Sequence, residues 1–99
     1  MIVIAGKALA KAGMETKVIE AIRVMCEASE AEEGCISYQI YQHPENRTEF
    51  FVFEEWENQA ALEKHFQTEH MQKFNEVLAT ALAGATKIKR YDVSDVTNL

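Results

Sequence analysis

Runs of β-branched and aromatic side chains recur four times along the 99-residue chain, and each predicts a strand. The four predicted strands span residues 2–9, 35–42, 48–57 and 85–93. Between the second and the third, the segment "HPENR" holds the only proline of the chain and predicts a tight turn. These two strands are therefore expected to form a hairpin.

Three other stretches repeat their apolar positions at helical spacing. They span residues 14–32, 59–66 and about 69–82. In the first stretch, Val18, Ile22 and Met25 fall on one face, opposite a charged face. Asn58 and Thr68 are suitable N-caps for the second and third stretches, so a break between two helices is expected at Thr68.

The resulting order of elements is β-α-β-β-α-β, with the second helical segment divided in two. This order predicts an α+β fold of the ferredoxin-like class, in which helices cover one face of a four-stranded antiparallel sheet. A chain of this length forms one domain, which we place at residues 1–99.

The third predicted strand is apolar on both of its faces. Phe50 and Val52 point to one side, whereas Phe51 and Phe53 point to the other. A single copy of this fold covers only one face of its sheet, so the second face would be an exposed apolar patch. We expect a homodimer packed sheet against sheet. The alternative is that long side chains of the same copy fold over this strand.

Glu54 and Trp56 continue the face of Val52 along the same strand. If the helices cover that face, Glu54 is a carboxylate in an apolar setting, and burial raises its pKa. The alternative is an ion pair with a strand neighbour or with Lys64. Trp56 and Phe74 belong to the core in either case, and as walls of a pocket they would stack on a flat ring.

Two of the three histidines lie close together, five residues apart. His65 is either a surface side chain at a helix C-terminus or a proton acceptor at the mouth of a pocket. His70 lies in the first turn of the next helix, where either packing or contact with a ligand accounts for it. Because this spacing is not the i, i+4 pair of a continuous helix, no metal site is expected.

The charge and the cysteine content indicate which partners and which cellular compartment to expect. The net charge is −6, and no basic cluster opposes it, so neither nucleic acid nor an anionic membrane surface is an expected partner. The apolar run at the N-terminus is too short to cross a bilayer. Cys26 and Cys35 are interpreted as unpaired thiols of a reducing compartment, which predicts a cytoplasmic protein.

The segment "EEGCISYQIYQHPENRTEFFVFEEWENQAALEKHFQTEHMQKF" resembles the antibiotic biosynthesis monooxygenase domain, in its quinol-monooxygenase-like branch. The matching positions are Gly34, Tyr38, Glu54, Trp56, Ala61 to His65, Thr68, His70 and Phe74. The resemblance implies a dimeric α+β barrel with a pocket between sheet and helices in each copy. It also implies oxidation of a phenol, anthrone or quinol by molecular oxygen without a metal, flavin or other cofactor.

This chain departs from the characteristic residues of two subfamilies. Where the anthrone-oxidising relatives have an asparagine and an arginine, this chain has Val52 and Glu76. The three positions used by haem-degrading relatives correspond to Gly6, His65 and Asn75 here, which argues against haem. The substrate expected from the resemblance is therefore a small aromatic quinol or phenol.

We accordingly expect His65 and Glu54 to be the catalytic pair, with His65 at the rim of the pocket and Glu54 deeper inside. The residues expected to contact the substrate are Trp56, Phe74, His70, Tyr38 and Val52. The alternative is a dimeric protein without oxidative activity, either a binding protein or an isomerase, that uses the same pocket for a small metabolite.

Overall fold

The computed structural model describes residues 1–99 and confirms the ferredoxin-like order of elements. Most element boundaries lie within two residues of those predicted from the sequence. The elements are β1 (Ile2–Leu9), α1 (Glu15–Glu30), β2 (Cys35–Gln42), β3 (Glu49–Trp56), α2 (Gln59–Phe66), α3 (Glu69–Ala81) and β4 (Lys87–Asp92).

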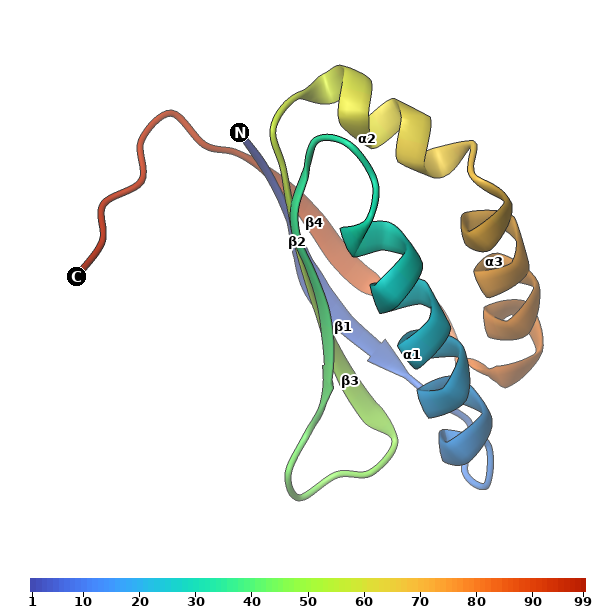
Figure 1. Cartoon of the computed structure of the whole chain (residues 1–99). Helices are drawn as coiled ribbons and strands as arrows, with labels where there is room; N and C mark the ends of the chain where they lie inside the picture. Colours follow the sequence, from blue (N-terminus) through green and yellow to red (C-terminus); the bar gives the residue numbers. More distant parts are fainter.

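The four strands form one antiparallel sheet in the order β2-β3-β1-β4. All three helices lie on the same side of this sheet, and the C-terminal segment leaves on the other side (Figure 1). Gly6 of β1 pairs with Ile88 of β4. A Cβ atom at Gly6 would collide with the backbone of Lys87 and Ile88, so only glycine permits this close approach of the two strands.

Strand β3 alternates strictly between a covered and an open side. Its covered side carries Phe50, Val52, Glu54 and Trp56, each at most 7% exposed, whereas Phe51 on the opposite side is 44% exposed. The period of two therefore confirms the predicted orientation of this strand. One face of the sheet is open in the single chain, as the two-faced pattern predicted.

The core lies between the covered face and the helices. Trp56, Met25 and Leu62 are its largest fully buried apolar side chains. Asn58 and Thr68 cap α2 and α3 as expected, because their side-chain oxygens accept hydrogen bonds from the backbone N–H groups of Ala61 and Met71. The break at Thr68 thus separates two capped helices.

Helix α1 ends at Glu30, two residues before its predicted end. The following turn is closed by backbone hydrogen bonds from Glu32 N to Ser29 O (3.0 Å) and from Cys35 N to Glu32 O (3.2 Å). Gly34 has a φ of +84° and completes the turn into β2. Glu32 therefore lies in a turn rather than on the charged face of a helix.

Two further expectations concern cysteine pairing and membrane crossing. Cys26 and Cys35 are both free thiols, and both are partly buried. Burial raises the pKa of Cys35 to about 12, so this thiol stays protonated at neutral pH. The longest helix has 16 residues, and no helix combines the length and the apolar character needed to span a bilayer.

Candidate functional site

A cavity of about 240 Å³ lies between the covered face of the sheet and the helices. Its walls are mostly apolar and come from all four strands and from α1 and α3. Of the seven site residues predicted from the sequence, four line this cavity: Tyr38, Val52, Glu54 and Phe74. Trp56, His65 and His70 do not line it.

Glu54 is the only acidic side chain in the cavity wall, and it is 7% exposed. Its Oε1 accepts a hydrogen bond from Trp56 Nε1 at 2.9 Å. Burial raises the pKa of Glu54 to about 7, and the hydrogen bond from Trp56 only partly offsets this effect. None of the ion pairs includes Glu54, so the alternative pairing with Lys64 does not form. This carboxyl can take up or release a proton near neutrality.

Tyr38 adds a neutral phenol to the same cavity. Its side chain is 2% exposed, and its hydroxyl makes no hydrogen bond within the chain. Burial raises the pKa of Tyr38 well above its usual range, and the negative charge of Glu54 acts in the same direction. The hydroxyl therefore remains protonated and can donate a hydrogen bond to a bound ligand.

His65 is completely buried, so its predicted position at the rim of the cavity is wrong. Its ring packs against Trp56, with centroids 4.5 Å apart, and against Tyr38, with centroids 5.5 Å apart. The cause is helical spacing, because Ala61, Leu62 and His65 share the inward face of α2. Burial lowers the pKa of His65, although its hydrogen bond with Glu32 opposes the shift.

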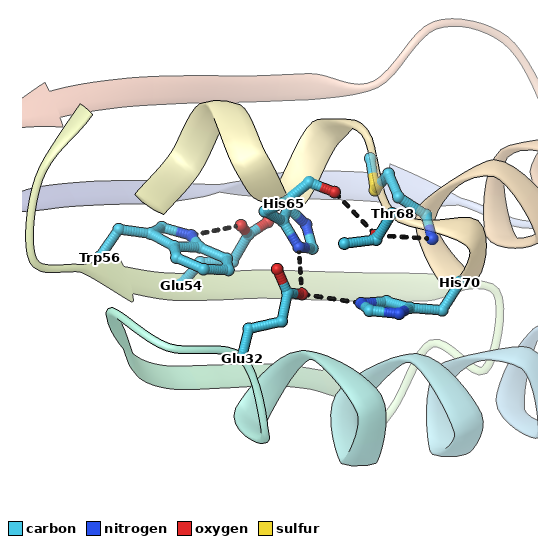
Figure 2. Close-up of polar contacts among 7 residues, drawn as sticks. Glu32, Glu54, Trp56, His65, Thr68 and His70 are labelled. Carbon is cyan, nitrogen blue, oxygen red and sulfur yellow. Dashed lines mark hydrogen bonds and ion pairs between the residues drawn. The ribbon is translucent and has the colours of Figure 1, made fainter. Parts of the chain in front are cut away.

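A cluster of Glu32, His65 and His70 lies beside this aromatic packing (Figure 2). His65 Nδ1 and His70 Nε2 each lie 2.7 Å from Glu32 Oε2. His65 Nε2 is buried and has no hydrogen-bond partner. The five-residue separation of the histidines does not keep them apart, because the chain turns at Thr68 and brings both rings to one carboxylate.

Glu32 is the member of this cluster that the sequence did not indicate. It lies in the acid-rich stretch "EASEAEEG", where nothing in composition or spacing distinguishes it from Glu30 or Glu33. In the structure Glu32 lies beyond the end of α1, and its carboxylate contacts His65 of α2 and His70 of α3. His70 faces a second, more open groove of about 420 Å³ between α1 and α3.

Comparison with known proteins supports the resemblance seen in the sequence. The family model for antibiotic biosynthesis monooxygenases matches residues 1–77. An uncharacterized Synechocystis protein is 36% identical over 98 residues, which cover 99% of this chain and 67% of that protein. A Nitrosomonas europaea structure whose name assigns it to the same family superposes with a TM-score of 0.89 at 25% identity, covering 94% of this chain and 98% of the other.

A second solved structure, from Pseudomonas aeruginosa, is also similar. It superposes with a TM-score of 0.85 at 28% identity and covers 94% of each chain. Agreement over nearly the whole length of both chains means that the two structures share the same fold.

Proposed function

Because the chain belongs to the antibiotic biosynthesis monooxygenase family, we propose that it oxidises a small quinol or phenol with molecular oxygen. The reaction takes place in the cavity between sheet and helices and uses no cofactor. The observation that carries this proposal is the position of Glu54: a buried carboxyl with a pKa of about 7 in a mostly apolar wall. Such a group is suited to accept a proton from a bound hydroxyl near neutral pH.

The size of the cavity favours a substrate with one or two rings. Its volume of about 240 Å³ is below the roughly 300–1,000 Å³ of pockets that hold drug-sized ligands. Phe74 and Val52 provide apolar contact for a flat ring, and the Tyr38 hydroxyl donates a hydrogen bond to a ring oxygen. Most of the wall is apolar, so both polar contacts are stronger here than they would be in water.

In the proposed reaction Glu54 removes the hydroxyl proton, and the resulting anion is electron-rich enough to react with oxygen. For a quinol, one oxygen atom enters the ring and the other leaves as water, so that quinol and O₂ give a hydroxyquinone and H₂O. The substrate supplies all four electrons, and no external reductant is needed. Trp56 holds the Glu54 carboxyl by its hydrogen bond, and the ring of His65 packs against the ring of Trp56.

Oxygen uptake with a panel of substituted quinols and phenols tests this proposal. We expect turnover to rise with pH through about 7 as Glu54 loses its proton. Glu54→Gln should lower kcat by about 10²–10⁴-fold, the usual contribution of a general base. The matched control is Glu55→Gln, which makes the same change on the opposite face of β3 and should leave turnover close to wild type.

Two results would contradict the proposal. Full activity of the Glu54→Gln variant would show that another group takes the proton. Binding of quinols without any oxygen uptake would instead support the alternative, a small-molecule binding protein or an isomerase that uses the same cavity.

A further inference from the structure

We propose that Glu32, His65 and His70 form a binding site for one divalent transition-metal ion such as Zn²⁺. The three side chains come from three segments: the turn after α1, the last turn of α2 and the first turn of α3 (Figure 2). One oxygen and two nitrogen atoms of this set lie within 4.8 Å of one another. Both nitrogens lie 2.7 Å from the same carboxylate oxygen.

This donor set matches the coordination chemistry of zinc. Two imidazole nitrogens and one carboxylate oxygen bind Zn²⁺ at about 2.0–2.2 Å and leave the fourth tetrahedral position for water. Atoms bound at that length around a tetrahedral ion are about 3.4 Å apart, so the contacts of 2.7 Å must widen by about 0.7 Å. Glu32 lies in a turn, and His70 is partly exposed, so both side chains have room to adjust. The same donors suit Co²⁺ and Fe²⁺.

Without a metal ion, the hydrogen bonds to Glu32 favour a different tautomer of His65 from the one that binds a metal. If both imidazoles donate to Glu32 Oε2, His65 carries its proton on Nδ1, and its buried Nε2 has no partner. A metal ion at Nδ1 requires the other tautomer, with the proton on Nε2. The His65 ring packs against the rings of Trp56 and Tyr38, and an aromatic face of this kind can accept a weak N–H···π contact. The two states are therefore distinguishable by the position of one proton.

The cluster is accessible from outside and separate from the cavity. The side chains of Glu32 and His70 are 13% and 22% exposed, and His70 lines the open groove between α1 and α3. An ion and its water ligand can enter there, while the buried His65 anchors the site. None of the three residues lines the cavity that holds Glu54. The ion would link the end of α1 to the break between α2 and α3, and its ligand His65 packs against Trp56, which holds the Glu54 carboxyl.

Calorimetric titration of the chelator-treated full chain with Zn²⁺ tests the site. We expect one saturable site per chain. Glu32→Gln and His70→Gln each remove a ligand, so affinity should fall by more than the roughly 10–100-fold that losing an outer-shell partner costs. His43→Gln in the hairpin and Cys35→Ser serve as controls, because they remove the remaining imidazole and the thiol nearest in sequence to Glu32. Both controls should bind as the wild type does.

Two spectroscopic measurements identify the ligands directly. Co²⁺ in place of Zn²⁺ should show the intense visible absorption of a four-coordinate ion, and the Glu32→Gln variant should lose it. ¹⁵N NMR should show the proton of His65 moving from Nδ1 to Nε2 when Zn²⁺ binds. The proposal is overturned if the wild type has no saturable site, if both ligand variants retain it, or if the proton stays on Nδ1. Because binding is measured without substrate, these outcomes are distinct from a failure to oxidise quinols.

Discussion

At the scale of single residues, Glu54 follows directly from the period of a strand. The alternation that places Phe50, Val52 and Trp56 under the helices must place Glu54 there as well. Its buried position and raised pKa were therefore predictable from the sequence once the covered face was identified. The hydrogen bond from Trp56, two residues along the same face, satisfies one carboxyl oxygen and leaves the other available to a ligand.

The ionisation of Glu54 predicts a pH dependence of stability. The pKa of its carboxyl rises from 4.5 to about 7 on folding, so between these values the folded state holds a proton that the unfolded state has lost. The stability associated with the neutral carboxyl is complete below pH 4.5 and is lost as the pH rises through about 7. Glu54→Gln cannot ionise, so above pH 7 it should be more stable than the wild type by up to about 3 kcal/mol.

Denaturant unfolding of both proteins, followed by circular dichroism, measures this difference. The advantage of Glu54→Gln should shrink as the pH is lowered from 7 to below 4.5, because the wild-type carboxyl becomes neutral first in the folded state and then in the unfolded state as well. A stability difference that does not change with pH would show that Glu54 is not the titrating group.

At the scale of elements, the sequence predicted where the strands and helices lie. It did not predict the turn after α1 or how deeply α2 is buried. Apolar periodicity extends through each element and therefore locates it. The turn after α1 has no such period, and so neither the early end at Glu30 nor the direction of Glu32 could be predicted. His65 was misplaced for a related reason. Periodicity predicts that α2 has a buried face, but the depth of that face depends on how α2 packs against the sheet.

The break between α2 and α3 lies at Thr68, whose hydroxyl makes two hydrogen bonds. Its hydroxyl donates to His65 O at 2.8 Å and accepts from Met71 N at 3.2 Å. Thr68→Ala removes both and should reduce the free energy of unfolding by about 1 kcal/mol, as loss of an N-cap typically does. Thr68→Ser keeps the hydroxyl and should lose much less. Equal stability of the two variants in thermal unfolding would show that the cap does not stabilise the break.

At the scale of the whole molecule, the face of the sheet opposite the helices remains uncovered. Tyr41, Phe51 and Tyr91 on this face are 61%, 44% and 49% exposed, and Phe53 is partly buried. The pairing register places Tyr41 beside Phe51 on neighbouring strands, so these side chains form one surface. We call these four residues the open face. An aromatic surface of this kind on a small chain is typical of an interface.

The open face predicts a homodimer that packs sheet against sheet. Phe53 pairs with Ala5 of β1 and Gln39 of β2, which places it at the middle of the sheet rather than at an edge. Phe53→Asp would put an unpaired charge into that interface, and so it should give a monomer or an aggregate. Val24→Asp is the matched control, because Val24 is 65% exposed on α1, away from the open face, and this change should leave the assembly intact. Light scattering of dilute protein measures both outcomes. A monodisperse monomer for the unmutated chain would contradict the dimer and would leave the aromatic open face to be covered by a different partner.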